Sequence, residues 1–251
     1  IYMGDWSSDV CSSDLVAVQS QDPAGAKWSV GQRVKNGTDA LVEHAFASGR
    51  ILRTHVLRPT WHYVTPEDIR WVVQVTAPHV HKLNAYQYRQ LELTPAVCAR
   101  AHTILSRALQ GGRQLTRPEL ALELEQGGIV AEKVRLAYIM MQAELDGLIC
   151  SGAMRGKQHT YGLLEERAPN ARTLGRDEAL AELTRRFFIG HAPATLKHLV
   201  WWSGLPVADA KKGLEMVRHQ LGSEIVNGQT FWFGEAKPAP RKAIWRSKSV
   251  V

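Results

Sequence analysis

The chain has 251 residues, of which 45% are hydrophobic and 22% charged, a composition that excludes a disordered or fibrous protein. Its formal net charge of +7 is compatible with a polyanionic partner but does not identify one. The apolar stretches are far shorter than the roughly 20 residues of a membrane span. Three cysteines, Cys11, Cys98 and Cys150, are too few for a disulfide framework or a zinc cluster. Composition therefore predicts a soluble, cytoplasmic protein.

The two ends of the chain differ from the rest. Residues 1–15 carry three aspartates and no basic residue, lack the apolar centre of a secretory signal, and resemble a translated sequencing-adapter sequence. We expect them to be a non-native or disordered leader, with the native chain resuming at Val16. Residues 235–251 carry five basic residues and Glu235, and we expect a truncated basic tail. Without both ends, residues 16–234 keep a net charge of +6, so the basic excess belongs to the body of the chain.

The first predicted unit is residues 16–97. Thr38 is an N-cap that predicts a helix ending at Gly49. Strands follow at residues 51–57 and 61–64, on either side of the turn Arg58-Pro59-Thr60. Thr65-Pro66-Glu67-Asp68 combines an N-cap, a proline at the first helical position and two acids. This segment predicts an extra helix after the hairpin.

The second predicted unit, residues 98–172, has the clearest pattern. Helices are predicted at residues 99–109, 116–126 and 131–145, the second with the capping box that Thr116 and Glu119 form. Strands at 148–151 and 158–163 flank a loop at 152–157. Three short helices followed by a hairpin are the winged-helix form of the helix-turn-helix.

The third predicted unit, residues 173–234, repeats this order. Helices are expected at about 177–189, 194–203 and 207–220, followed by strands 224–226 and 230–233 on either side of Asn227-Gly228. The predicted fold is mainly α with short β-hairpins, arranged as three tandem winged helix-turn-helix units. Stacked units of this kind form a concave surface that suits a DNA duplex.

Several kinds of chemistry are excluded. Gly156-Lys157-Gln158 lacks the hydroxyl residue and the glycine spacing of a phosphate loop, and no Gly-x-Ser-x-Gly elbow exists. His79 and His81 have no cysteine or carboxylate cluster nearby, which favours a surface or packing role, so no metal site is expected.

Nucleic-acid binding is the positive signal. Arg155 and Lys157 lie in a hairpin loop, where a wing meets a phosphate backbone, and Lys133 and Arg135 lie at the start of a third helix. Any solvated loop carries such residues, so these four positions alone leave an ordinary surface role open. Three units of one type in the same chain favour DNA binding.

Four segments of the chain resemble one family, the bacterial winged-helix DNA glycosylases that unhook interstrand crosslinks and excise bulky N7-alkylated purines. The segments are Val18–Trp28, Ser48–Trp71, Leu145–Pro169 and Phe187–Lys211, and the resemblance extends from about residue 16 to 234. It implies three tandem winged helices around a concave DNA-binding surface, with double-stranded DNA as the partner and no cofactor. We expect a monomer.

The catalytic motif of that family is Gln, an apolar residue and Gln, and it matches Gln19-Ser20-Gln21, with Ser20 as a departure. The resemblance implies that the two amides orient a water and stabilise positive charge at C1′ as the base leaves. No lysine nucleophile is implied, so the reaction is expected to be monofunctional, without strand cleavage. From the residues alone, a helix surface is the better interpretation of the two glutamines.

The same resemblance implies that Arg58, Thr60 and His62 on the first hairpin face DNA or a pocket, although His62 fits a packed core position as well. If residues 1–15 are foreign, the helix that supports the glutamine motif is missing and the chain is a fragment of impaired activity. The alternative function is a non-catalytic winged-helix DNA-binding protein of the transcription-regulator type. A third possibility, an interaction module with no nucleic-acid role, is opposed by the basic charge.

Overall fold

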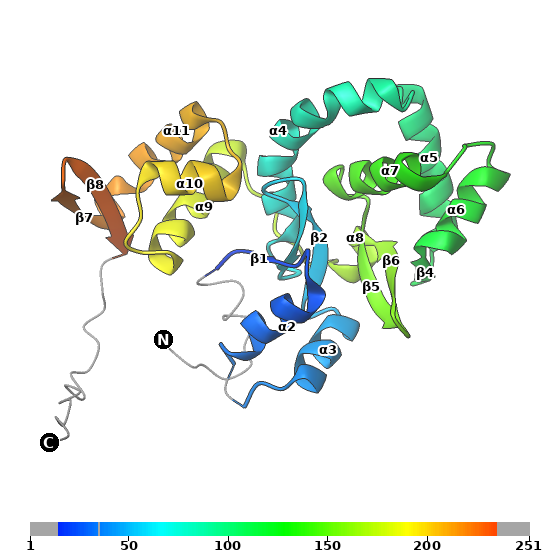
Figure 1. Cartoon of the computed structure of the whole chain (residues 1–251), viewed down its shortest axis with the longest axis horizontal. Helices are drawn as coiled ribbons and strands as arrows, with labels where there is room; N and C mark the ends of the chain where they lie inside the picture. Colours follow the sequence, from blue (N-terminus) through cyan, green and yellow to red (C-terminus); the bar gives the residue numbers. More distant parts are fainter. Residues whose placement is uncertain (1–14, 35, 235–251) are drawn as a thin grey trace, which may run out of the picture.

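The computed structural model of the chain describes residues 15–34 and 36–234 (Figure 1). The predicted tail and residues 1–14 of the predicted leader lie outside the described residues. Leu15, the last leader residue, packs against the core of the first unit. The described part is mainly helical with three small antiparallel sheets, which confirms the predicted mainly α class. None of its helices is both long and apolar enough to cross a membrane.

The first unit contains a three-stranded sheet with the strand order β1-β3-β2. Its elements are β1 (Val18–Gln19), α2 (Pro23–Gly31), α3 (Asp39–Ala47), β2 (Leu52–Val56) and β3 (Thr60–Val64). Thr38 caps α3 as predicted, because its hydroxyl accepts from the Leu41 N–H at 3.2 Å. Helix α2 was not predicted. Asp22 caps it by accepting from the Ala24 N–H at 3.1 Å, and Pro23 occupies its first turn.

Helix α4 (Ile69–Gln90) follows the first hairpin and curves over the molecule (Figure 1). The predicted start near Pro66 is wrong. The Thr65 carbonyl accepts from the N–H groups of Asp68 and Ile69, which makes a turn before the helix. The Asp68 side chain does not cap the helix but accepts from Trp71 Nε1 at 2.8 Å. Pro78 lies inside the helix, where its missing N–H favours a bend.

The second unit has the same sheet topology, with the strand order β4-β6-β5. Its elements are α5 (Pro95–Leu109), β4 (Leu115–Thr116), α6 (Arg117–Gln126), α7 (Lys133–Leu145), β5 (Ile149–Arg155), β6 (Gln158–Leu163) and α8 (Leu164–Arg167). The predicted capping box is confirmed by the Thr116 N–H, which donates to Glu119 Oε2 at 2.7 Å. The predicted loop 152–157 is wrong. Strand β5 continues through a bulge to Arg155, so only Gly156 and Lys157 form the turn.

The third unit has a two-stranded sheet, and all its predicted helices are present. Its elements are α9 (Arg176–Gly190), α10 (Leu196–Ser203), α11 (Val207–Val217), the 3-10 helix η1 (Arg218–Gln220), β7 (Leu221–Val226) and β8 (Gln229–Gly234). Asn227 and Gly228 have φ values of 51° and 76°, as the predicted two-residue hairpin turn requires. Ala194 forms an isolated antiparallel bridge to Trp232 of β8.

The three units repeat one pattern: a short strand or bridge, two helices and a hairpin. In each unit, a residue of the short strand or bridge lies opposite an aromatic residue of the second hairpin strand. The pairs are Val18 with Tyr63, Leu115 with Tyr161, and Ala194 with Trp232. The residues that follow, Gln19, Thr116 and Thr195, therefore occupy equivalent positions.

Each unit has its own apolar core, and a fourth cluster lies at the junction around α4. Asp68, which is almost fully buried there, pairs with Arg186 of α9 at 2.5 Å and with Arg172. Burial opposes ionisation of Asp68, but the bond from Trp71 and the two arginines outweigh it and lower the pKa of this carboxyl. This ionic cluster attaches the third unit to the first.

Candidate functional site

The two glutamines of the predicted motif lie at the edge of the first sheet. Gln19 ends β1 opposite His62, and Gln21 lies between β1 and α2. Both are exposed, whereas Ser20 is fully buried. The Trp61 N–H donates to Gln21 Oε1 at 3.4 Å. The helix-surface alternative is therefore wrong, and the burial of Ser20 accounts for the apolar residue that the motif has at this position.

Arg53 of β2 supports the motif from within the protein. Its guanidinium is buried and donates through Nε and Nη2 to the Ser20 carbonyl, at 3.4 and 3.3 Å. The guanidinium carbon lies 4.2 Å from the centroid of the Trp61 ring. Burial lowers the pKa of Arg53, and the attraction of Glu144 opposes this change. Because arginine stays protonated in proteins, a fixed positive charge lies directly behind the two glutamines.

Contacts with the second unit fix Arg53 and Trp61. The Arg53 N–H donates to Ser151 Oγ of β5 at 2.7 Å. His55 Nδ1 pairs with the carboxylate of Glu144 on α7, and both side chains are buried. The His55 ring also lies 4.4 Å from the Trp61 ring. The strand behind the glutamines is therefore attached to a neighbouring core and is a rigid base for them.

His62 is a buried, neutral histidine beside Gln19. Burial lowers its pKa to about 4, the bond to Thr60 opposes this change, and the positive charge of Arg58 adds to it. The Thr60 carbonyl lies 3.0 Å from Nδ1 and only accepts, so Nδ1 carries the proton and Nε2 keeps a lone pair. His62 thus has the burial of a core residue and the location of a site residue.

Buried polar atoms without a partner are concentrated around this sheet. Five of them make no hydrogen bond within residues 15–34 and 36–234: Ser20 Oγ, Thr54 Oγ1, Arg58 Nε, Thr60 Oγ1 and Trp61 Nε1. Buried polar groups are normally hydrogen-bonded, and exceptions mark strained or functional places. Thr54 lies opposite His62, which lies opposite Gln19, so these atoms surround the motif.

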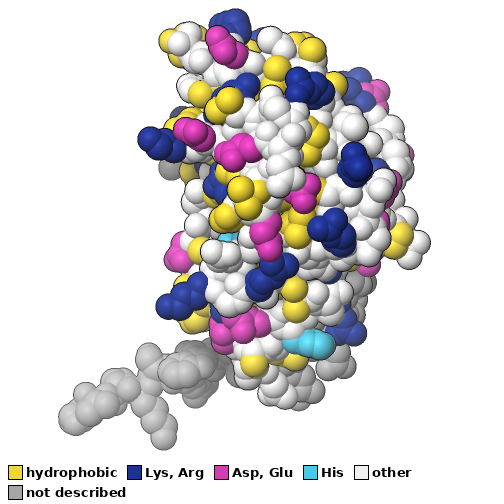
Figure 2. Space-filling view, turned by 90° about the vertical axis from the view of Figure 1, so that its right-hand side faces the viewer, with side chains coloured by type: hydrophobic (Ala, Val, Ile, Leu, Met, Phe, Trp, Pro, Cys, Tyr) yellow, Lys and Arg dark blue, Asp and Glu magenta, His cyan; other side chains and the backbone are white. Residues whose placement is uncertain are grey.

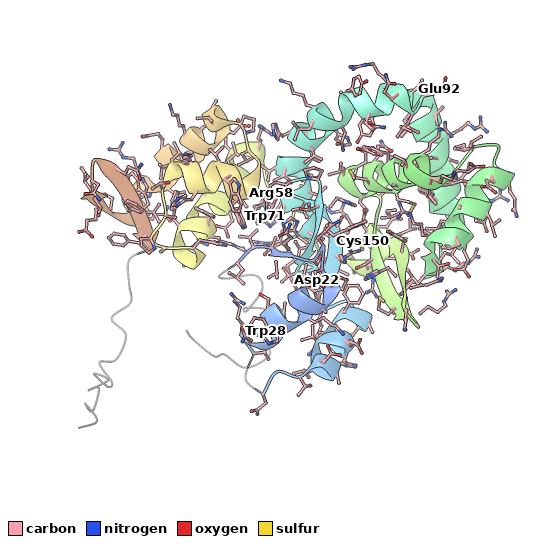
Figure 3. All side chains as sticks on the ribbon, in the orientation of Figure 1. Asp22, Trp28, Arg58, Trp71, Glu92 and Cys150 are labelled. Carbon is pink, nitrogen blue, oxygen red and sulfur yellow. The ribbon has the colours of Figure 1, made fainter. Side chains whose placement is uncertain are left out.

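The turn between β2 and β3 carries Arg58 to the third unit. A Cβ on Gly204, which follows α10, would lie 2.8 Å from the Leu57 carbonyl oxygen, so only glycine fits this contact. The Arg58 guanidinium carbon lies 4.7 Å from the centroid of the Trp201 ring. Figure 3 shows Arg58 between the third unit and the first sheet, with Asp22 at the start of α2. The fold thus brings the predicted hairpin residues and the glutamines into one cluster.

The other four predicted DNA contacts lie in the second unit. Lys133 and Lys157 are exposed, at the first residue of α7 and in the β5–β6 turn. Among the described residues, no hydrogen bond or ion pair joins these four positions to the glutamine cluster. The structure therefore forms two separate groups from the predicted site residues.

The two arginines of this second group already have intramolecular partners. Arg135 donates through Nε to the Leu91 carbonyl at 2.9 Å and through Nη1 to the Val130 carbonyl. Arg155 pairs with Glu119 at 2.7 Å and donates to the Gln114 carbonyl. Both guanidinium groups thus stabilise helix ends of the second unit. Lys133 and Lys157, which are exposed, are the better candidates of this group for phosphate contacts.

The outer face of the second unit carries charges of both signs. Figure 2 shows Lys and Arg side chains interspersed with Asp and Glu on this side of the molecule. A DNA-binding face normally carries a continuous basic patch. The charges on this face thus do not form one continuous basic patch.

Three residues of the site escape sequence reasoning. Arg53 and His55 lie in a strand whose residues are all buried, and a charged residue in such a run of Leu, Thr and Val was a usable signal. Trp201 has a neighbouring tryptophan, Trp202, and only the structure shows which of the two is packed.

The described residues contain no group of three or more His, Cys, Asp or Glu side chains that could hold a metal ion. His81 of the predicted histidine pair instead contacts Asp146 at 3.0 Å and Tyr88 at 3.1 Å. The Cys150 thiol is buried, which raises its pKa to about 12 and makes it unreactive.

Comparison with known proteins identifies a family and a solved structure of similar fold. A family model described as "DNA glycosylase AlkZ-like" matches residues 13–246 of the chain. The solved structure of Streptomyces sahachiroi DNA glycosylase AlkZ is similar, with a TM-score of 0.75 and 21% sequence identity over 92% of this chain. The match covers 65% of that structure, so the chain spans about two thirds of its length. No curated protein sequence is significantly similar to the chain.

Proposed function

The chain belongs to the AlkZ-like DNA glycosylase family, and we propose that it is a monofunctional DNA repair glycosylase. Its proposed substrates are bulky N7-alkylated purines and interstrand crosslinks in double-stranded DNA. It hydrolyses the N-glycosidic bond and leaves the strand intact, and it needs no cofactor. We place it in the cytoplasm as a monomer.

We propose that the three units are tandem winged helices whose stacking forms a concave surface for the duplex. Their shared order of a short strand or bridge, two helices and a hairpin supports this proposal. Lys133 and Lys157 are the proposed phosphate contacts of the second unit, and Arg135 and Arg155 reach DNA only if they exchange their present partners. The first-sheet cluster of Gln19, Gln21, Arg58, Thr60 and His62 faces the lesion.

The observation that carries the catalytic proposal is the geometry of the motif. Gln19 and Gln21 expose their amides on either side of buried Ser20, whose carbonyl Arg53 fixes. Neutral amides are weak bases but orient a water through their oxygens and offer those oxygens to a developing positive charge. Preorganised dipoles of this kind are effective where charge develops in the transition state.

The proposed reaction suits such modest help. An N7-alkylpurine already carries a positive charge, so it leaves with the electron pair of the C1′–N9 bond and becomes neutral. The water held by the glutamines adds to C1′ and releases its proton to solvent. Arg53 acts as a positioning residue here, because it touches Ser20 and not the reacting atoms.

The direct test uses a duplex with one bulky N7-alkylguanine. After incubation with the protein, hot alkali cleaves the DNA wherever a base has been lost. We expect strand breaks with the wild type and a loss of about 100-fold or more in rate for the double variant Gln19→Ala, Gln21→Ala. Breaks before alkali treatment would contradict the monofunctional mechanism.

A binding measurement on the same duplex distinguishes a glycosylase from a non-catalytic DNA-binding protein. Wild-type protein that binds without producing alkali-labile sites would overturn the glycosylase proposal and support the regulator alternative. Affinity should also fall as salt rises, because phosphate contacts release counterions. The double glutamine variant should bind undamaged duplex with the affinity of the wild type, because no phosphate contact has been removed.

A further inference from the structure

Trp201 has an exposure that packing does not explain. Its neighbour Trp202 lies in the third-unit core, 5.2 Å from the ring of Phe187 and 5.0 Å from that of His191. Trp201, the preceding residue of α10, is 69% exposed, while large aromatic side chains normally bury most of their area. The exposed indole is therefore available to a ligand.

Arg58 fixes this indole in place. Its guanidinium carbon lies 4.7 Å from the Trp201 ring centroid, and its Nε is buried without a hydrogen-bond partner among the described residues. The neighbouring contact between Gly204 and Leu57 locks the hairpin turn against the end of α10. The pair thus combines a rigid aromatic face with hydrogen-bond donors at one side.

A chain of neighbouring residues links this pair to the glutamine motif. Arg58 lies in the turn that leads into β3, the strand that carries His62. His62 in turn lies opposite Gln19. Trp61, also on β3, donates its backbone N–H to Gln21 Oε1 at 3.4 Å.

We propose that Trp201, held by Arg58, is a stacking site for an unpaired nucleobase next to the lesion. The proposal rests on the proposed function, because a base becomes unpaired when a glycosylase takes a damaged base out of the duplex. Every nucleobase has a flat π-face that stacks on indole, whatever the DNA sequence. The Arg58 guanidinium beside the indole offers hydrogen-bond donors to a base edge or a phosphate.

The charge of Arg58 selects the kind of base. A guanidinium over the indole repels a second cation, so the positively charged alkylpurine is a poor occupant of the same site. A neutral base has no such penalty. The occupant we assign is therefore the orphaned partner base or a neighbouring unstacked base, while the lesion itself goes to the glutamines.

Fluorescence anisotropy with two DNA probes tests this site without relying on excision. One probe is a fully paired duplex, and the other has the same sequence with one unpaired adenine. We expect the wild type to prefer the second probe. Trp201→Ala should weaken binding of that probe about tenfold and of the paired duplex less than about twofold. Trp201→Phe, which keeps a stacking ring, should keep most of the preference.

Tyr86→Ala is the matched control. Tyr86 is 63% exposed on α4 and has Arg89 6.0 Å from its ring centroid, so it is a similar pair far along α4 from the motif. It should leave both affinities unchanged. Equal weakening of both probes by Trp201→Ala, or no weakening, would overturn the stacking site alone. Wild-type protein that binds neither probe would overturn the proposed function as well.

Discussion

The first and second units put different side chains into the same backbone position. Gln19 and Thr116 each follow a residue that lies opposite a tyrosine of the second hairpin strand. In the second unit, Thr116 is also the N-cap of α6. In the first unit the cap of α2 is Asp22, three residues further along. The longer connection in the first unit thus frees Gln19 from capping and adds a second exposed glutamine.

The polar groups around the two positions differ in the same way. In the second unit, Arg155, Glu119 and Gln114 bond to one another and to the backbone of the sheet. In the first unit, five buried polar atoms around the motif have no partner among the described residues. Three such atoms also lie in the second unit, so what distinguishes that unit is the bonded network beside Thr116.

The largest expected effect on stability tests the ionic cluster that attaches the third unit to the first. Asp68→Asn removes the carboxylate that Arg186 and Arg172 share inside the junction between the first and third units. Loss of a buried charge partner should lower the free energy of unfolding by about 3 kcal/mol in a urea titration.

Asp209→Asn is the control for this change. It breaks the more exposed pair with Arg176 and should cost less than about 1 kcal/mol. The wild-type contribution of Asp68 should be complete above its unfolded pKa near 3.9 and disappear as pH falls through its lower folded pKa. Equal effects of the two variants would contradict the buried role of Asp68.

Arg53→Met tests whether the first unit depends on a charge behind its glutamines. The change leaves the Ser20 carbonyl without its donors, so the free energy of unfolding should fall by about 2 kcal/mol. The rate of base excision should fall further than this loss of stability explains at a temperature where the protein stays folded. Ser151→Ala, which removes a contact of the Arg53 N–H from the second unit, should leave the rate closer to the wild type. Equal rates for the two variants would remove Arg53 as a positioning residue.

The stability of the first and second units should depend on acid pH through one buried histidine in each sheet. Burial lowers the pKa of His62 and of His159 to about 4. Between pH 6.5 and 4 the unfolded chain binds a proton at each histidine and the folded chain does not. The free energy of unfolding should therefore fall as pH falls across this range, by at most about 1.4 kcal/mol per pH unit for each histidine.

Each histidine can be removed from this pH dependence in turn. His62→Gln and His159→Gln should each flatten part of the curve of unfolding free energy against pH. A curve for either variant that is as steep as the wild-type curve would show that its histidine is not the buried neutral group described above.

The smallest effect concerns the third unit, which extends the comparison. Thr195 occupies the position of Gln19 and Thr116, and it caps α10 in a capping box with His198. Thr195→Ala should lower the free energy of unfolding by about 1 kcal/mol and leave excision unchanged. A marked loss of excision would mean that this position is functional in more than one unit.

Most helices and all three hairpins could be predicted from the sequence, because capping residues and Asn227-Gly228 act locally. Strands β1 and β4 could not, because two-residue strands exist only through pairing with a distant hairpin. Helix α2 had a usable signal in Asp22-Pro23 that the glycine and serine after it obscured. The late start of α4 follows from the use of Asp68 in the junction, which is a tertiary contact.

The site was predictable only in part. The resemblance supplied the glutamines and the hairpin residues, and the fold places them together. Trp201 needed the structure, because exposure is not a local property, whereas Arg53 had a signal as a charged residue within an apolar strand. Arg135 and Arg155 were predicted as DNA contacts from a basic pattern, and such a pattern does not reveal their intramolecular partners near helix ends.

The most direct test compares Gln19→Ala with Thr116→Ala in both excision rate and unfolding free energy. Single-turnover excision of a bulky N7-alkylguanine should fall about 100-fold for Gln19→Ala, with stability unchanged within about 0.5 kcal/mol. Thr116→Ala should lose about 1 kcal/mol of stability and keep the wild-type rate. A Gln19→Ala variant that is less stable but equally active would contradict the central claim that this position serves catalysis in the first unit and capping in the second.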